Sequence, residues 1–396
     1  MFLTRIEEKM LSGNMGEAVQ LAARIVVKIG DVLGAERLVT IEDAHISGIS
    51  FKNIGDSGLE FLMMLVEKNA KFKVPTTINP AGFDFKKWSK MKIDSYFLEK
   101  QKRVIDCLVK MGAKPILSCT PYEVKRIKYG QHIAWSESNA VLYANSVIGA
   151  RTNREGGPLA IFEAIIGRAP YTGLHLNENR LPNVLVQISD IKEKVSPALV
   201  GYALGMIVKK GVPYVKNFYF KDLNEVKLFL AAVGASSSIG LVLLEGISPD
   251  LLRNRRRIRK IKLNKVEITK DDLENAYSKI SRELTNVDAF LLGCPHLSAE
   301  ELEKIHGFLR KRNVEKRLIL FTSRQVIEEN SKIVEELENK GVEIYGDTCM
   351  VVSDIRKMGI KRLILDSAKA AYYLTAQGYE VSLLDREEIL RIISGE

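Results

Sequence analysis

Hydrophobic and polar positions along the chain recur at two spacings, one helical and one strand-like. In the first third the spacing is helical in 17–33, 58–68 and 99–111 and strand-like in 37–41, 71–75 and 114–118. The loop DAHISGIS follows the first of these strands. Because strands and helices alternate, we predict an α/β fold in which a mostly parallel sheet is covered by helices.

The same alternation returns near the C-terminus. Strand-like runs VDAFLLGCPH, RLILFTS, VEIYGD and RLILDS are interspersed with helical patterns at 298–311, 325–340 and AKAAYYLTAQG. Between the two α/β regions, VSPALVGYALGMIVKKG predicts a buried helix, and GASSSIGLVLLEG favours close helix packing through glycine and serine. We predict three approximate lobes: 1–130, α/β; 131–285, central; and 286–396, α/β.

Composition is typical of a globular protein and does not suggest a membrane protein. The 396 residues are 46% hydrophobic and 27% charged. No stretch approaches the ~18 apolar residues of a membrane-spanning helix. The N-terminus, MFLTRIEEKMLSG, carries acidic residues where a signal peptide is basic and then apolar. We therefore expect a cytoplasmic protein without a membrane partner.

The net charge of +10 leaves nucleic-acid binding open as an alternative. Lys and Arg are spread over the whole chain and mixed with 49 acidic residues, and only 253–265, RNRRRIRKIKLNK, is a concentrated run. A solvated face or a subunit contact is the favoured interpretation of this run. A basic RNA- or partner-binding protein is the non-enzyme alternative, although no nucleic-acid partner is expected.

Several polar or thiol-bearing stretches follow predicted strands. They are 45–50, 76–80, Cys119, Cys294 and 366–369, and Cys349 follows a further strand. In open parallel sheets, ligands bind beyond the carboxyl ends of the strands. We therefore expect these stretches to converge at one site.

Three of the four cysteines are candidates for metal ligands. Cys107 lies on the apolar face of a predicted helix and is expected to be a small buried hydrophobic residue. Cys119, Cys294 and Cys349 lie beside turn residues. Thiolates are the ligands of iron–sulfur clusters, and three of them leave one iron with an open position. Because the chain has no CxxC motif, spacing alone leaves three unrelated buried thiols as the alternative.

The stretch 135–158, WSESNAVLYANSVIGARTNREGGP, is unusually polar for a segment with an apolar run. Burying so many polar side chains requires a partner for each, either protein, ligand or water. A solvated loop that contains a helix is the alternative.

Read together, TTINP, SCTPY, AWSESNAVLYANSVIGARTNREGGP, GCPH and GDTCM resemble the large, catalytic subunit of the aconitase X family. The likeness covers essentially the whole chain and is greatest to the archaeal members. It implies aconitase-like catalytic lobes that lack the swivel domain. A small subunit that carries this domain, and a catalytic serine with it, is the expected partner in a heterodimer.

The resemblance also implies a reaction and a cofactor. The reaction is dehydration of a small phosphorylated hydroxy acid, (R)-5-phosphomevalonate, to trans-anhydromevalonate 5-phosphate, and the alternative substrate is another hydroxy acid such as cis-3-hydroxy-L-proline. The cofactor is an iron–sulfur cluster, expected as 4Fe–4S, bound by Cys119, Cys294 and Cys349. The CxxC pair of ordinary aconitase is missing, so cluster type does not follow from that relative.

Dehydration of a β-hydroxy acid needs a base, an acid for the leaving hydroxyl and donors for the carboxylate. Glu137 is the candidate that hydrogen-bonds the leaving hydroxyl or moves a proton, and Ser138 is a candidate for positioning substrate. A paired core carboxylate is the alternative for Glu137. His45 is a candidate for orienting a proton-transfer chain, with a satisfied core histidine as its alternative.

The remaining candidates bind substrate. The backbone N–H groups of Gly48 and Ile49, with the Ser50 hydroxyl, suit an anionic oxygen, although an ordinary turn is the default. Asn79 and Pro80 follow another strand and offer an amide in a fixed turn, with a plain strand-to-loop cap as the alternative.

Lys369 is expected in the first turn of the last helix, after the N-capping residues Asp366 and Ser367. A bound phosphate or carboxylate would stabilise a cation there, and an exposed lysine is the alternative. Arg151 and Arg154 fit either a carboxylate clamp or structural braces to Glu137 or Glu155, and are not first-rank candidates.

Overall fold

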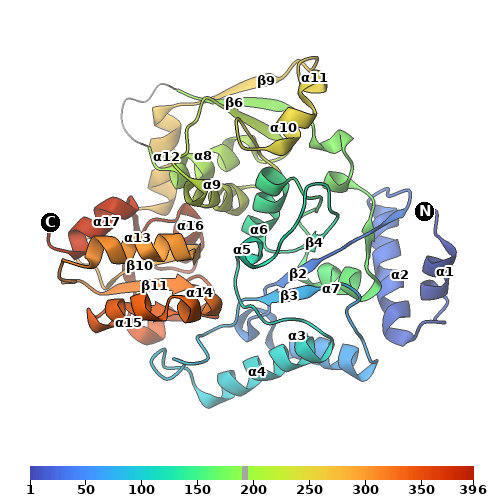
Figure 1. Ribbon diagram of the computed structural model, residues 1–396, viewed down its shortest axis with the longest axis horizontal. Helices are drawn as coiled ribbons and strands as arrows, with labels where there is room; N and C mark the ends of the chain where they lie inside the picture. The colour runs from blue at the N-terminus through green and yellow to red at the C-terminus, as the bar shows by residue number, and fades with distance from the viewer. Residues whose placement is uncertain (190–194) are drawn as a thin grey trace.

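The computed structural model describes residues 1–189 and 195–396 of the chain (Figure 1). Within these residues the strands form four sheets, three of which are entirely parallel. The antiparallel pair joins β1 (Leu38–Thr40) to β5 (Arg168–Pro170). The predicted α/β fold with mostly parallel sheets is therefore confirmed. No helix in the described part of the chain is long and apolar enough to cross a bilayer.

The N-terminal sheet is built around β2 (Ala44–Ser47), which pairs with β3 (Thr76–Asn79) on one side and β4 (Ala134–Trp135) on the other. The helices of this unit are α1 (Arg5–Leu11), α2 (Glu17–Val32), α3 (Phe51–Glu67), α4 (Ser95–Lys110), α5 (Pro121–Val124), α6 (Ser138–Tyr143) and α7 (Gly157–Ile166). A π-helical turn, Ala144–Ile148, extends α6, and 3-10 turns lie at Gly173–His175 and Glu178–Arg180. Because β4 completes this sheet, the N-terminal unit continues past residue 130.

Two strand predictions and one loop prediction in this unit are wrong. The run 71–75 is not a strand, and β3 begins immediately after Pro75. The run 114–118 makes only one isolated bridge, from Lys114 to Thr77, because Pro115 has no N–H and Leu117 has a positive φ of 50°. The loop DAHISGIS contains β2, whose residues are mostly buried and so show no alternating pattern.

The helix predictions of this unit are closer, and α2 matches the pattern at 17–33. The N-terminal boundary of α3 differs, because the helix begins at Phe51 and bends at Gly55, where φ is 58°. Polar residues in this first turn concealed the start of the helix from the apolar pattern.

The central unit has the sheet order β8-β7-β6-β9. Its strands are β6 (Val184–Ile188), β7 (Pro213–Lys216), β8 (Leu243–Leu244) and β9 (Asn264–Ile268), and its helices are α8 (Pro197–Val208), α9 (Leu223–Ser236), α10 (Pro249–Arg253), α11 (Arg255–Ile258) and α12 (Lys270–Ile280). α8 is the buried helix predicted for this region, and it packs side by side with α9 (Figure 1). Gly201 and Gly205 of α8 allow this close approach, because a Cβ on Gly201 would lie 2.3 Å from the Phe229 carbonyl oxygen.

The C-terminal unit has the strand order β12-β11-β10-β13-β14. The strands are β10 (Ala289–Leu297), β11 (Leu318–Thr322), β12 (Glu343–Tyr345), β13 (Arg362–Leu365) and β14 (Glu380–Leu383). The helices are α13 (Ala299–Leu309), α14 (Arg324–Glu329), α15 (Ser331–Asn339), α16 (Ala368–Ala376) and α17 (Arg386–Ile393), with a 3-10 turn at Ile355–Met358. The order changes direction between β10 and β13, and such a switch point opens a crevice at the carboxyl ends of the two strands.

Lys369 lies in the first turn of α16, after the N-cap Ser367, as predicted. However, α16 is not the last helix, because β14 and α17 follow it.

Candidate active site

A cavity of about 270 Å³ opens where the N-terminal and C-terminal units meet. The N-terminal unit contributes Ser47, Gly48, Asn53, Asn79, Pro80, Cys119, Ser136, Glu137 and Ser138, and the C-terminal unit contributes Cys294, Cys349, Val351, Val352, Lys369 and Tyr373. Each stretch that was expected to converge beyond a strand contributes at least one of these residues. The crevice at the switch point of the C-terminal sheet therefore faces the strand ends of the N-terminal sheet.

A bulge in β10 carries Cys294 into the cavity. The register of β10 against β11 shifts between Leu292 and Leu297, and the Cys294–Pro295 peptide bond is cis. Gly293 precedes this bulge with a φ of 107°, and a Cβ there would lie 2.0 Å from the Phe321 carbonyl oxygen. Only glycine fits at this position, so Gly293 is a local requirement of the bulge.

The three candidate thiols share the cavity, whereas Cys107 lies in the core of the N-terminal unit, as predicted. Burial raises the pKa of Cys119 well above its usual value, raises that of Cys294 to about 12 and also raises that of Cys349. Neutral thiols held together in this way fit a metal group, because a bound metal supplies the positive charge that stabilises their thiolates.

The thiols do not form a single-ion site. In 1–189 and 195–396, no group of three or more His, Cys, Asp or Glu side chains is arranged to hold one metal ion. Each cysteine of a 4Fe–4S cluster binds a different iron atom, so its ligands are spread more widely than those of one ion. Three soft donors around one cavity are thus compatible with a cluster.

Glu137 and Lys369 form an ion pair on the cavity wall, with 2.6 Å between Oε1 and Nζ. Burial by itself raises the pKa of Glu137, but the Lys369 ammonium outweighs burial and holds this pKa below its ordinary value. Burial likewise opposes the charge of Lys369, yet Glu137 and the neighbouring thiols raise its pKa overall. Both side chains are therefore charged at pH 7.

Asn139 ties this ion pair to the segment that carries Cys119. Its side-chain amide donates to Glu137 Oε1 at 3.1 Å and to the Cys119 carbonyl oxygen at 3.1 Å. The Tyr122 hydroxyl donates to Oδ1 of the same Asn139 amide at 3.2 Å. None of the polar side chains of 135–158 is fully exposed, and the solvated-loop alternative does not hold for this stretch. Those that are buried are Asn139, Asn145, Ser146, Arg151 and Thr152.

His45, Ile49 and Ser50 lie behind the cavity wall rather than on it. Burial and the Lys125 ammonium lower the pKa of His45 to about 3, so the imidazole is neutral. Its Nδ1 lies 2.8 Å from Thr77 Oγ1. Within the described residues, His45 Nε2, Ser50 Oγ and both amide atoms of Asn79 have no hydrogen-bond partner, which leaves polar capacity next to the cavity.

Other cavity residues were missed by sequence reasoning. Ser47, Asn53, Ser136 and Tyr373 line the wall. Of these, Ser47 lies within the stretch 45–50 that was expected at the site, and Ser136 immediately precedes Glu137 in the polar stretch, whereas Asn53 and Tyr373 had no such signal.

The loop from Gly48 to Ser50 is held by a buried glutamine on α4. Gln101 accepts from Phe51 N–H at 2.9 Å and from Gly82 N–H at 3.1 Å, and it donates to the Ile49 carbonyl oxygen at 3.1 Å. Nothing in the spacing of the sequence distinguishes this glutamine from a surface residue.

An arginine joins the two units that enclose the cavity. Arg324 donates to Asp84 at 2.6 Å and to Asp347 at 2.6 Å. Asp84 also accepts from Gly346 N–H, and the Asp347 carbonyl accepts from Ala81 N–H. These contacts hold the segment after Pro80 against the segment before Cys349.

Arg151 and Arg154 are structural braces, although not to the acids considered from the sequence. Arg151 pairs with Asp250 at 3.3 Å, and Arg154 donates to the carbonyl oxygens of Ser237 and Gly234. They join the polar stretch to the central unit and do not line the cavity.

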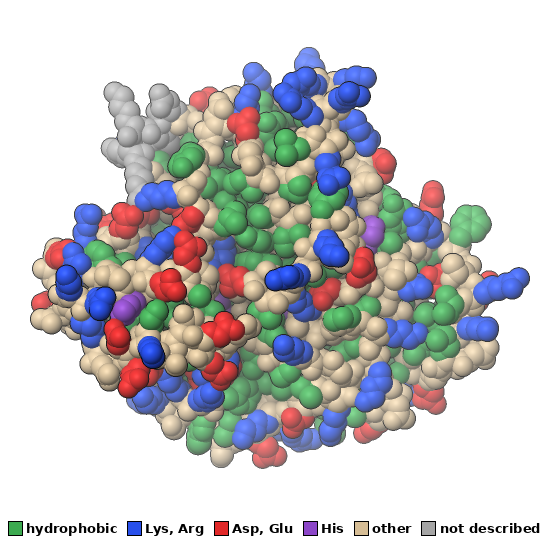
Figure 2. All heavy atoms as spheres, viewed as in Figure 1, with side chains coloured by type: hydrophobic (Ala, Val, Ile, Leu, Met, Phe, Trp, Pro, Cys, Tyr) green, Lys and Arg blue, Asp and Glu red, His purple; other side chains and the backbone are tan. Residues whose placement is uncertain are grey.

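The basic run 253–265 extends from the last residue of α10 through α11 into the first residues of β9, in the central unit. Figure 2 shows Lys and Arg side chains gathered at the top of the view, over this part of the molecule. None of these residues lines the cavity.

A polar cavity at the switch point of a parallel sheet identifies the class of protein, an α/β enzyme that acts on a small substrate. The chain belongs to the aconitase X family. Its residues 1–178, 182–278 and 287–394 match the sequence models for the aconitase X first, second and third domains.

Relatives match over nearly all of the chain. Phosphomevalonate dehydratase large subunit from Methanocaldococcus jannaschii is 39% identical, with 99% of this chain and 100% of the relative covered. The crystal structure of Thermococcus kodakaraensis aconitase X (holo-form) superposes with a TM-score of 0.90 at 38% identity, covering 99% of each chain. Cis-3-hydroxy-L-proline dehydratase from Pseudomonas aeruginosa is 33% identical over 94% of this chain but only 66% of its own length.

Proposed function

We propose that this chain is the large subunit of a hydro-lyase that dehydrates (R)-5-phosphomevalonate to trans-anhydromevalonate 5-phosphate in an archaeal type of mevalonate pathway. The observation that carries the proposal is the match, end to end, to a phosphomevalonate dehydratase large subunit. The hydroxyproline dehydratase is less similar and is about half as long again as the matched region.

The cavity offers charged groups that suit this reaction. Glu137 is ionised and lies beside Lys369, so its carboxylate accepts a hydrogen bond from a substrate hydroxyl or moves a proton at Oε1 or Oε2. Lys369 uses one N–H on Glu137 and has others that suit a substrate carboxylate or phosphate. Ser138 and Asn79 add polar groups at the wall that orient the substrate.

We assign Cys119, Cys294 and Cys349 as the ligands of an iron–sulfur cluster, expected as 4Fe–4S. When bound, such a cluster supplies a Lewis acid for the leaving hydroxyl. The three thiols reach the cavity from three separate segments, and each lies on the wall that the substrate would face.

A small subunit that carries the swivel domain is the proposed partner. The relatives are named as large subunits, and the longer hydroxyproline dehydratase contains sequence beyond the region matched here. Closing the cavity with this domain would exclude water and bring in further catalytic groups.

The substrate assignment is tested with the two-subunit enzyme, purified without oxygen and supplied with (R)-5-phosphomevalonate or cis-3-hydroxy-L-proline. Mass spectrometry of the product detects the loss of water, and we expect this loss from phosphomevalonate only. Turnover of hydroxyproline alone would overturn the assignment.

Glu137→Gln, which keeps the side-chain shape, should lower kcat by at least about 100-fold if the carboxylate moves a proton.

A further inference from the structure

His296 contacts the segments of all three candidate cysteines, although it does not line the cavity. It lies on β10, two residues after Cys294, and its side chain is fully buried. Such a histidine is either an ordinary core residue or part of the support of the cysteine site.

The two ring nitrogens of His296 bind the residues that precede the other two cysteines. Nε2 lies 2.8 Å from the Thr348 carbonyl oxygen, immediately before Cys349, and Nδ1 lies 3.2 Å from Ser118 Oγ, immediately before Cys119. A carbonyl only accepts, so Nε2 carries the proton. With the proton on Nε2, Nδ1 is free to accept the hydrogen bond from the Ser118 hydroxyl.

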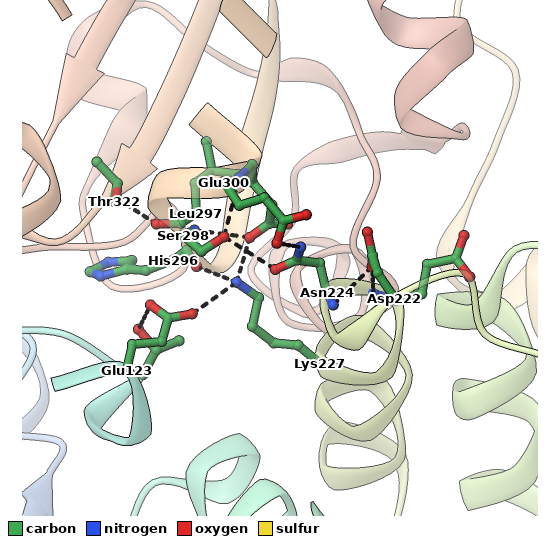
Figure 3. Close-up of polar contacts among 12 residues, drawn as sticks. Glu123, Asp222, Asn224, Lys227, His296, Leu297, Ser298, Glu300 and Thr322 are labelled. Carbon is green, nitrogen blue, oxygen red and sulfur yellow. Dashed lines mark hydrogen bonds and ion pairs between the residues drawn. The ribbon is translucent and has the colours of Figure 1, made fainter. Parts of the chain in front are cut away.

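The backbone of His296 makes two further contacts. Its N–H donates to Cys119 Sγ at 3.4 Å, and its carbonyl oxygen accepts from Lys227 Nζ at 2.9 Å. Figure 3 shows Lys227 extending from α9 toward His296 and Glu123. Lys227 also bonds to Glu301 at 2.5 Å, which fixes the ammonium in place.

Together with further hydrogen bonds, these contacts form a closed hydrogen-bond network. Glu123 accepts from the Thr120 hydroxyl at 2.9 Å and from Lys227 at 3.3 Å, and the Thr120 backbone N–H donates to Ser118 Oγ at 3.2 Å. Starting from Ser118, the path runs through Thr120, Glu123 and Lys227 back to the histidine. A buried network in which every member has a partner holds its segments rigidly.

We propose that His296 is a positioning residue that sets the spacing of Cys119, Cys294 and Cys349 for the iron–sulfur cluster. The inference rests on the cluster assigned above. Each cysteine lies on a different segment. The His296 ring bonds to two of these segments, and its backbone continues from the third. Outer contacts of this kind commonly change metal affinity by about 10–100-fold.

The test compares iron retention and folding in four variants. His296→Ala removes both ring contacts, His296→Gln retains a donor for Thr348, and Ser118→Ala removes only the hydroxyl. His175→Ala is the matched control, because His175 is equally buried and bonds to a second histidine, His132, away from the cavity.

The cluster is reconstituted without oxygen, and its loss to an iron chelator is followed by visible absorbance. We expect His296→Ala to lose iron at least tenfold faster than the wild type, with His296→Gln and Ser118→Ala in between and His175→Ala unchanged. Melting of each iron-free variant separates a loss of fold from a loss of cluster support.

Iron release from His296→Ala at the wild-type rate, or equally fast release from His175→Ala, would overturn the inference. So would a wild-type chain that takes up no cluster. A wild-type chain that binds a cluster but fails to dehydrate phosphomevalonate would instead overturn the proposed substrate and leave the role of His296 standing.

Discussion

At the scale of single residues, the ion pair between Glu137 and Lys369 determines what the cavity can do. Both charges are present at pH 7, and under the proposed function Glu137 acts as acceptor or base and Lys369 as a donor to anions. A buried charge is tolerated here because its partner lies 2.6 Å away. Each side chain therefore depends on the other for its protonation state.

Lys369→Met tests this dependence. The substitution leaves the Glu137 carboxylate buried and unpaired, and we expect the free energy of unfolding at pH 7 to fall by about 3 kcal/mol. Adding Glu137→Gln should restore most of that loss. Denaturant unfolding of the iron-free chain measures both, and a double variant no more stable than Lys369→Met would contradict the account.

The difference in unfolding free energy between the wild type and Lys369→Met should depend on pH, and its direction follows from the pKa of Glu137. In the wild type the pKa of Glu137 is lowered, so the stability that its charge contributes is present above its unfolded pKa and is lost as pH falls. In Lys369→Met, burial without the ammonium raises this pKa, so acid favours the folded variant. The deficit of the variant should therefore shrink between pH 7 and pH 4.

At the scale of elements, the contact of α8 with α9 supports the central unit. Gly201→Ala would place a Cβ 2.3 Å from the Phe229 carbonyl oxygen, which is backbone and moves only with its helix. We expect a loss of about 1–3 kcal/mol in thermal or denaturant unfolding. Gly307→Ala on α13 is the control, because a Cβ at Gly307 would meet no atom within 4 Å and the change should be neutral or stabilising by up to ~1 kcal/mol. Equal effects of the two substitutions would refute the packing argument.

Elements differed in how well the sequence predicted them. α2 and α8 were predicted because long apolar patterns are hard to mistake. β2 was missed because four mostly buried residues show no alternation, and the strand predicted at 114–118 was wrong because Pro115 and Leu117 interrupt the extended backbone. Short central strands are identified by their neighbours in the sheet, which the local pattern does not contain.

At the scale of the whole molecule, the cavity exists only because two units meet. Arg324 bonds to Asp84 across 240 residues of sequence, and His296 bonds to Ser118 across 178. The sequence predicted which strand ends carry chemistry, and the resemblance gave roles to Glu137 and the cysteines. Gln101, Asn53 and Tyr373 were missed, because their place depends on the tertiary arrangement and not on any motif.

The central claim is that three cysteines from separate segments hold one iron–sulfur cluster in this cavity. The most direct test is iron and acid-labile sulfide analysis of the oxygen-free, reconstituted protein in four single Cys→Ser variants. We predict wild-type iron and sulfide for Cys107→Ser and loss of both for Cys119→Ser, Cys294→Ser and Cys349→Ser. Wild-type iron and sulfide in any of the last three, or their loss in Cys107→Ser, would contradict the claim.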